Sequence, residues 1–380
     1  GTLTWMDTSD GEIAIPRSAR EAITFRLDGL GREEVRVLET LGIAGGSTDI
    51  TALAFALDLE PAVLQATVDE LSTQRILRCR EENGRETWSF QLSMTRELVL
   101  ERIRPSRQNL LRRRLATVMV NAPASAHKIT LLAAAGHSDK ALADTLLWAG
   151  PLIERGRARE ALPVLEKIAG TVGQAQQTSL ADLARFWLLY GRAVRQLHPM
   201  DERVQKSFRR AAELTLDPEI TAAADLYASK SLIERGLLEP GRTRLLDAHN
   251  TLAGTNSPLL QARVARDLGN LQWFRGRFDE AENWFEAALS AARQVGKKEE
   301  LASCLVARAV ADLGAGNLHK AEQQLREAIH LYETSGDRYG LWQALGNLSE
   351  ILRHRCAFSE AIGLLEPELK GAYASGDIER

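Results

Sequence analysis

The sequence is poor in cysteine, proline and aromatic residues. Its 380 residues include only three cysteines, Cys79, Cys304 and Cys356, and no C-x-x-C pair, so its spacing gives neither a disulfide framework nor a structural zinc site. We therefore expect a cytoplasmic protein. Prolines number 11 and aromatic residues make up 6%, whereas the good helix formers Ala, Leu, Glu and Arg are frequent. A mainly α-helical protein follows.

Long apolar runs are also missing. No segment approaches the roughly 18 apolar residues that a transmembrane helix needs, and no basic-then-apolar signal segment opens the chain, so we expect no membrane association. The 44% hydrophobic and 26% charged residues and a net charge of −3 are typical of a soluble protein with two or three domains. Because the first residue is Gly1 rather than Met, we expect the chain to be part of a longer protein.

Recognisable catalytic and cofactor motifs are absent from the sequence. There is no G-x-x-x-x-G-K-[ST] phosphate loop, no G-x-S-x-G elbow, and no H-E-x-x-H or H-x-x-x-H pair among the seven histidines. Gly314-Ala315-Gly316 is similar to part of a dinucleotide loop, but no strand precedes it, and a turn is favoured. We expect no enzyme activity, no cofactor and no metal in this chain. An enzyme with scattered catalytic groups is the minor alternative.

The second half of the sequence repeats with a period of forty residues. One copy has the residue types and spacings of the tetratricopeptide pattern at Leu268, Gly269, Gly276, Ala281, Phe285 and Ala288. Further copies in the same register place Gly236, Gly316 and Cys356 at the position of Gly276. Four copies in one register predict a stack of helical hairpins.

The residue types of the repeat have a physical reason. Small residues allow the two helices of a hairpin to approach, and large apolar residues fill the space beside them. Gly276 and Gly316 favour the left-handed conformation in which a helix ends. Weaker copies around Ala161 and Phe208 extend the pattern upstream. We predict a tetratricopeptide-like superhelix, an α-solenoid of about six or seven hairpins, over residues 105–380.

The first hundred residues show a different organisation. Apolar residues recur at helical spacing in 17–30, 32–42, 51–58 and 61–73. Two alternating segments, 76–80 and 87–91, then flank an Asn83-Gly84 turn, which is typical of a β-hairpin. Three helices and a hairpin predict a winged-helix domain over residues 31–104.

DNA binding is the obvious use of a winged helix, and charge argues against it. The would-be recognition helix, 61–73, contains Asp69 and Glu70 and no Lys or Arg. A nucleic-acid-binding module using the stretch from Arg102 to Arg114 and the wing residues Arg78, Arg80 and Arg85 is the alternative hypothesis. We favour the interpretation that the arginine stems pack over the domain junction, because no aromatic residues interleave them.

The start of the chain carries a family resemblance. The string from Ile15-Pro16-Arg17 to Ile23, followed by Arg26-Leu27-Asp28-Gly29-Leu30, resembles the passage from the ATPase lid into the winged helix of signal-transduction ATPases with numerous domains. This group includes maltose-regulator-type activators and large kinase or cyclase fusions. The order of winged helix and tetratricopeptide superhelix is similar over essentially the whole chain.

The resemblance implies that residues 1–30 end an ATPase lid or linker helix and that the winged helix packs on the parent's own ATPase domain as a switch. The superhelix would sense a protein, peptide or small-molecule inducer. Family members often carry a His two residues after the wing's Phe, followed by an apolar residue and Arg-Glu. Here Phe90, Arg96 and Glu97 match that pattern, but Leu92 replaces the His.

The partner-binding residues are expected on the first helix of each hairpin, which lines the concave face. Offsets from Gly269 select Arg263, Arg266, Asn270 and Trp273, and the preceding copy adds Lys230. Arg266 and Asn270 resemble the cation and amide of a carboxylate clamp, although the next copy offers Val310 and Leu313. Alternatively, Trp273 fills the interface between repeats and the arginines pair with acids such as Asp267.

The missing phosphate loop generates a first prediction. We expect isothermal titration of this chain with ATP and magnesium to show no saturable binding, because the backbone cradle that holds phosphates has no counterpart in the sequence. Saturable, magnesium-dependent binding would contradict it.

Overall fold

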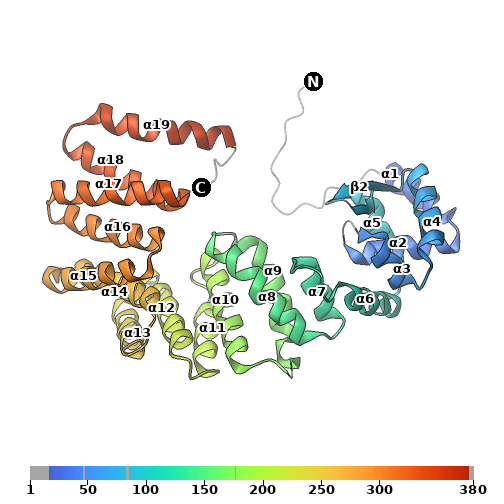
Figure 1. Cartoon of the computed structure of the whole chain (residues 1–380), viewed down its shortest axis with the longest axis horizontal. Helices are drawn as coiled ribbons and strands as arrows, with labels where there is room; N and C mark the ends of the chain where they lie inside the picture. Colours follow the sequence, from blue (N-terminus) through green and yellow to red (C-terminus); the bar gives the residue numbers. More distant parts are fainter. Residues whose placement is uncertain (1–16, 46–47, 83–84, 176, 376–380) are drawn as a thin grey trace. The chain divides into compact units, whose positions relative to one another are not determined.

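The computed structural model describes residues 17–45, 48–82, 85–175 and 177–375 (Figure 1). The chain forms two compact units, Gly1–Thr178 and Ser179–Arg380. The predicted lid segment therefore lies partly outside the described residues, as do Ile15, Pro16 and the turn residues Asn83 and Gly84. The predicted domain boundary at residue 105 falls inside the first unit, between two helices.

The first unit begins with a small domain of helices and one antiparallel sheet. Strand β3 is central, with β1 and β2 on either side, and Cys79 of β2 pairs with Trp88 of β3. The elements are α1 (Arg17–Asp28), α2 (Arg32–Ala44), β1 (Thr48–Asp49), α3 (Ile50–Leu57), α4 (Pro61–Thr73), β2 (Leu77–Glu82), β3 (Arg85–Phe90) and α5 (Ser93–Arg102). This order contains the predicted three helices and hairpin, and adds the short strand β1.

Local sequence signals set the ends of these helices. The Asp49 side chain accepts a hydrogen bond from the backbone N of Ala52 at 2.8 Å and so caps α3. Pro61 stands in the first turn of α4, where a missing backbone N–H costs nothing. Leu38, Leu53 and Leu64 are buried, one from each of the three helices. The apolar period of each segment therefore marks the face that forms the core.

The rest of the first unit is helical. The chain continues as α6 (Pro105–Met119), α7 (Ala126–Ala134), α8 (Ser138–Glu154), α9 (Ala158–Thr171) and a short 3₁₀ turn, η1 (Val172–Gln174). Gly136 and Gly156, at the turns after α7 and α8, have φ values of 88° and 76°. These turns have the left-handed geometry that the repeat pattern predicts for a hairpin.

The second unit is built entirely of paired helices in its described part. They are α10 (Leu180–Leu197), α11 (Glu202–Glu213), α12 (Pro218–Glu234), α13 (Leu238–Thr251), α14 (Pro258–Phe274), α15 (Phe278–Val295), α16 (Lys298–Gly314), α17 (Leu318–Ser335), α18 (Arg338–His354) and α19 (Phe358–Ser375). The first helices α12, α14, α16 and α18 begin forty residues apart, as the sequence period predicts. The fold is an α-solenoid of tetratricopeptide-like hairpins.

The turns inside these hairpins follow the predicted register. Gly236, Gly276 and Gly316 have φ values of 77°, 75° and 83°. Cys356 occupies the same place in the last hairpin and has a φ of 57°. A residue with a Cβ is strained in this conformation, so the turn geometry is imposed on Cys356 by the packing of the two helices.

Close approach of the two helices depends on small residues opposite rings. A Cβ added to Gly269 on α14 would lie 2.7 Å from Cε1 of Phe285 on α15. Gly191 on α10 stands in the same relation to Phe208 on α11, also at 2.7 Å. Ala281 is buried beside this contact, and so is Ala321 in the following hairpin.

Larger side chains at these alanines are expected to destabilise the array. Ala281→Leu or Ala321→Leu should cost about 1–3 kcal/mol in the free energy of unfolding, measured by urea denaturation, because the helix contact would be overfilled. Ala287→Leu, at an exposed position of α15, is the control and should be near neutral. Neutral results at both buried alanines would show that the register is wrong.

Candidate partner-binding surface of the repeat array

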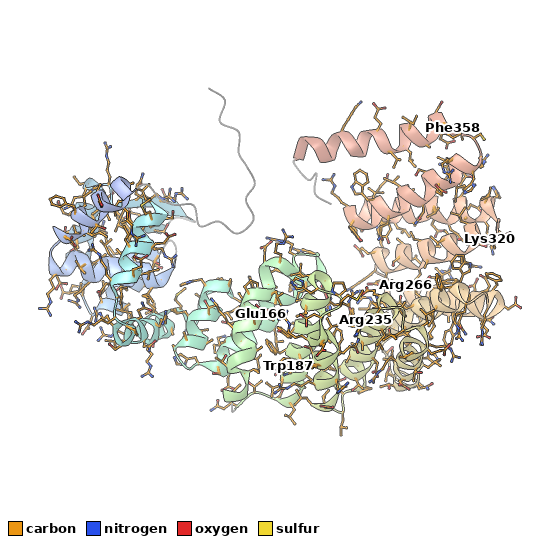
Figure 2. The ribbon with its side chains drawn as sticks, turned by 180° about the vertical axis from the view of Figure 1, so that it is seen from behind. Glu166, Trp187, Arg235, Arg266, Lys320 and Phe358 are labelled. Atoms are coloured by element: carbon orange, nitrogen blue, oxygen red, sulfur yellow. The ribbon has the colours of Figure 1, made fainter. Side chains whose placement is uncertain are left out.

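The predicted site residues lie on α12 and α14, and two of them, Lys230 and Arg266, join one network. The Lys230 ammonium lies 3.2 Å from an oxygen of Asp267. The Arg266 guanidinium contacts the other oxygen of Asp267 at 2.9 and 3.0 Å and donates to Oγ of Ser303 on α16 at 2.7 Å. Figure 2 labels Arg266 in the repeat array. A chain of polar contacts therefore links the first helices of three successive hairpins.

Arg263 adds a second ion pair to the same surface. Its Nε donates to both oxygens of Glu300 on α16, at 3.0 and 3.1 Å. Its side chain is 27% exposed, and that of Glu300 is 12% exposed. The carboxylate partner comes from the next hairpin, so this pair also ties α14 to α16.

The Asp267 carboxyl of the network is held in its charged form. Burial acts to raise the pKa of the Asp267 carboxyl, but Lys230 and Arg266 outweigh it and hold that pKa below its usual value. The pKa of Arg266 is raised: burial opposes this, and the charge of Asp267 is the main cause. Together with the separate Arg263–Glu300 pair, the surface holds the cations Lys230, Arg263 and Arg266 and two acids, so its formal net charge is +1.

Asn270 and Trp273, the remaining predicted residues, differ in their surroundings. The Asn270 side chain is exposed. The ring of Trp273 packs on α16, where a Cβ added to Gly314 would lie 2.2 Å from Cζ2 of the ring. Trp273 therefore fills the space between two hairpins, and its buried Nε1 has no hydrogen-bond partner among the described residues.

Two residues that the sequence did not single out extend the surface toward α10. The Arg192 guanidinium lies 4.8 Å from the centre of the Tyr227 ring, and the Lys230 ammonium lies 5.7 Å from it. Arg192 follows Gly191 as Asn270 follows Gly269, so the same offset would have found it. Tyr227 lies two residues before Ser229, which corresponds to Gly269, and this spacing does not mark a concave-face residue in the repeat pattern.

Cys304 lies in the same region and is chemically quiet. It is buried, and burial raises the pKa of its thiol to about 11, so the thiol is uncharged at neutral pH. No group of three potential metal ligands occurs among the described residues. The arrangement is suited to recognition by charge and hydrogen bonding.

The Arg102–Arg114 stretch contacts the small domain itself. Arg102 pairs with Asp28 at 2.8 Å, Arg107 with Glu39 at 3.2 Å, and Arg114 donates to the carbonyl of Ala56 at 3.3 Å. These arginines tie α5 and α6 to α1, α2 and α3. In the wing, the Nε of Arg78 donates to Oγ of Ser89, Arg80 is exposed, and the side chain of Arg85 lies outside the described residues.

The length and apolarity of the described helices determine whether one of them could span a membrane. In the described ranges, no single helix is long and apolar enough to cross a membrane. The pair α3 and α4 reaches that length and apolarity only jointly, with a bend of 112° between the two helices.

The buried charge of Asp267 should contribute to stability in a pH-dependent way. Asp267→Asn should lower the free energy of unfolding at pH 7 by about 3 kcal/mol, because the partly buried cations Lys230 and Arg266 lose their carboxylate partner. Since the folded-state pKa is depressed, the contribution is present above the ordinary pKa of about 4 and is lost as the pH falls through the folded value.

Urea denaturation of parent and variant from pH 7 to pH 3 measures this difference. The gap between them should shrink below about pH 4, whereas Glu327→Gln, at an exposed position in the middle of α17, should match the parent throughout. A gap that widens on acidification would contradict the assignment.

Part of this surface belongs to a segment that matches a known repeat family. Residues 260–334 match the family model of a tetratricopeptide repeat. That segment spans nearly all of α14 through α17 and includes Arg263, Arg266, Glu300 and Ser303. No curated protein matches the chain.

Several solved structures are similar at low identity. A signal-transduction ATPase with numerous domains and a tetratricopeptide repeat sensor, from Pyrococcus horikoshii, is 12% identical over 97% of this chain and 60% of its own, with a TM-score of 0.48. Aspartyl phosphate phosphatase F from Bacillus subtilis is 10% identical over 92% and 87%, with a TM-score of 0.48. A Rap protein complexed with competence and sporulation factor is 14% identical over 62% and 77%, with a TM-score of 0.45. The chain thus spans less than two thirds of the first of these proteins.

Proposed function

We propose that this chain is the non-catalytic sensor and interaction arm of a bacterial signalling or transcription-regulating ATPase of the maltose-regulator type. Its repeat surface binds a protein, peptide or small inducer, and the chain itself needs no cofactor. The observation that carries the proposal is the polar surface shared by α12, α14 and α16, with its net positive charge. Such a surface favours a partner that presents a carboxylate.

Two groups on this surface have different parts in the proposed binding. Arg266 is 14% exposed and already holds Asp267 and Ser303, so it sets the local charge and the spacing of the helices. Asn270 is exposed, lies on the same helix, and makes no hydrogen bond within the described chain. Asn270 is therefore the group free to contact a partner directly, and Arg266 acts from beneath it.

The small N-terminal domain has a different proposed role. Helix α4 exposes Asp69 and Glu70 and contains no basic residue, which disfavours contact with DNA phosphates. Arg102, Arg107 and Arg114 already contact the domain. We infer that this domain is a winged helix that docks on the ATPase domain of the longer protein and reports its nucleotide state. The nucleic-acid alternative has less support from these contacts.

Peptide binding tests the proposed surface. A pool of fluorescein-labelled decapeptides with Asp or Glu in their last three positions and a free carboxyl terminus should raise fluorescence anisotropy on adding the chain. The same pool with Lys in those positions should bind more weakly, because the surface carries net positive charge.

Asn270→Ala should weaken binding of the acidic pool about 2- to 12-fold, corresponding to roughly 0.5–1.5 kcal/mol for one hydrogen bond. Asn283→Ala, at an exposed position of the second helix α15, is the matched control. Arg266→Ala should also weaken binding, because it removes a positive charge from beneath Asn270, and its stability is measured alongside, since Arg266 also holds Asp267. Equal binding by both asparagine variants, or no preference for the acidic pool, would refute the proposal.

A further inference from the structure

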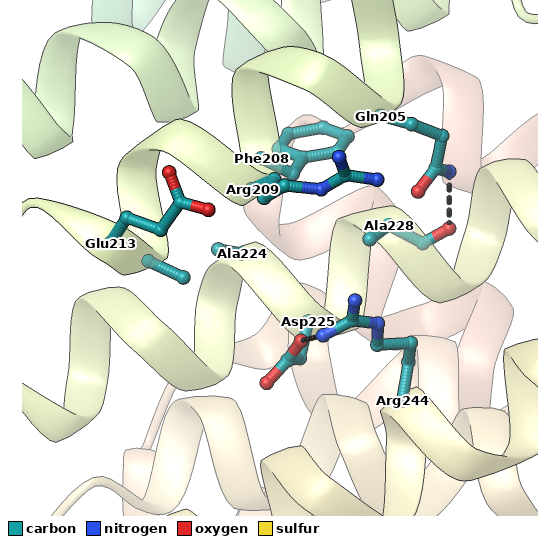
Figure 3. Close-up of a pocket in the computed structure, with 9 residues that line it drawn as sticks. Gln205, Phe208, Arg209, Glu213, Ala224, Asp225, Ala228 and Arg244 are labelled. Atoms are coloured by element: carbon teal, nitrogen blue, oxygen red, sulfur yellow. Dashed lines mark hydrogen bonds and ion pairs between the residues drawn. The ribbon is translucent and has the colours of Figure 1, made fainter.

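A pocket opens between the second helices α11 and α13, with the first helix α12 as its floor (Figure 3). Its volume of about 410 Å³ lies in the range of small-molecule sites. Ala224 and Ala228 of α12 form part of the floor, and Phe208 and Ala212 of α11 form part of one wall. The pocket lies on the side of α12 that faces the second helices, and its wall residue Phe208 stacks on Tyr227, with ring centres 6.1 Å apart.

In the next hairpin of the array, larger side chains occupy the place of the pocket. Forty residues on, Val264 and Leu268 replace the two floor alanines, and Trp284 replaces Arg244. The ring of Trp284 packs edge-on against His249, with ring centres 5.0 Å apart, and His249 stands where α11 has Ala212. Larger side chains therefore occupy the corresponding positions there.

In the hairpin after that, an arginine and two acids occupy the corresponding place. Arg308 stands at the place of Ala228 and pairs with Glu282 and, at 2.6 Å, with Glu286 of α15. These two acids take the places of Gln205 and Arg209. Thus the pocket arises because small residues stand where the following copies place an indole or an ion pair, while the backbone repeats.

The charged residues around the pocket are arranged with both signs. Asp225, 7% exposed, lies in the floor and accepts a hydrogen bond from Nη1 of Arg244 at 2.8 Å. Arg209 lines the opposite wall and makes no ion pair or hydrogen bond within the described residues. Glu213 also lines the pocket.

Gln205 completes the polar lining. Its amide nitrogen donates to the carbonyl of Ala228 at 3.0 Å, which fixes the side chain (Figure 3). Its amide oxygen accepts no hydrogen bond from the described residues and stays available as an acceptor. The pocket thus offers one unpaired guanidinium, one amide oxygen and one carboxylate to a ligand, beside the Asp225–Arg244 pair.

We propose that this pocket binds a small zwitterion of the amino-acid class. Two arginines, one aspartate and one glutamate line it, so its walls carry no net charge, and a simple anion or cation would face a group of its own sign. A ligand carboxylate pairs with the Arg209 fork. Its ammonium faces Glu213 and the Gln205 oxygen, and its apolar body lies over the alanine floor and Phe208.

Burial of Asp225 is consistent with this assignment of roles. Desolvation raises the pKa of its carboxyl, although Arg244 acts in the opposite direction. Because Asp225 already accepts a hydrogen bond from Nη1 of Arg244 at 2.8 Å, this pair forms part of the pocket wall, and Arg209 and Glu213 are the groups left for the ligand. This site is independent of the peptide-binding surface, and each can fail without the other.

Thermal shift and isothermal titration test the proposal. The probes are the twenty L-amino acids supplied singly, the N-acetyl and C-amide forms of any that bind, and inorganic phosphate. We expect at least one amino acid to raise the Tm of the chain, and either cap to weaken its binding at least tenfold, because each cap removes one of the two charges. No Tm rise with any amino acid would overturn the proposal, as would equal binding of a capped form or an equal Tm rise with phosphate.

Three variants assign the binding to the pocket. Ala228→Leu, which copies Leu268 of the next hairpin, should abolish the Tm rise by filling the floor. Arg209→Gln should weaken binding at least tenfold without loss of fold, since Arg209 is exposed and unpaired within the described residues. Lys206→Gln, which removes an exposed charge from the same helix, should bind like the parent. Unchanged binding by Arg209→Gln, or by a folded Ala228→Leu protein, would refute the site.

Discussion

In two hairpins of the array, the spacing of the helices rests on the contact between a glycine and an aromatic ring. Gly269 lets α14 approach Phe285 of α15, and Gly191 does the same for Phe208. Because protein interiors are close-packed, this contact fixes how far apart the helices lie and where the next hairpin can stack. At the observed spacing, Lys230 and Arg266 reach partners on neighbouring first helices.

The sequence predicted those features of the fold that one hairpin carries within itself. The forty-residue period, the turn at Gly276 and the fold class follow from local spacing, and the tetratricopeptide match confirms the repeat. The partners Glu300 and Ser303 escaped prediction because they belong to the next hairpin, and their contact with α14 depends on how hairpins stack. On a first helix, the face that lines the concave surface lies next to the face that packs on the neighbouring hairpin. Trp273 was therefore compatible with both interpretations.

In three successive hairpins, the corresponding position between the helices is filled in three different ways. It holds an open pocket above Ala228, apolar side chains including Trp284, and the ion pairs of Arg308. The backbone repeats with little regard for which solution is used, because the contacts that position the helices are made elsewhere, at residues such as Gly269 and Phe285. Recognition chemistry can therefore vary along the array without a change of fold.

The strained turn at Cys356 has a consequence for how the array opens. Stacked repeats behave as a one-dimensional chain of coupled units, in which the least stable unit opens first and its neighbours follow. The left-handed conformation costs a residue with a Cβ about 1–2 kcal/mol, and Gly236, Gly276 and Gly316 do not incur this cost. Helices α18 and α19 thus carry a penalty that the three preceding hairpins lack, and amide hydrogen exchange should spread from this hairpin to α17 and α16.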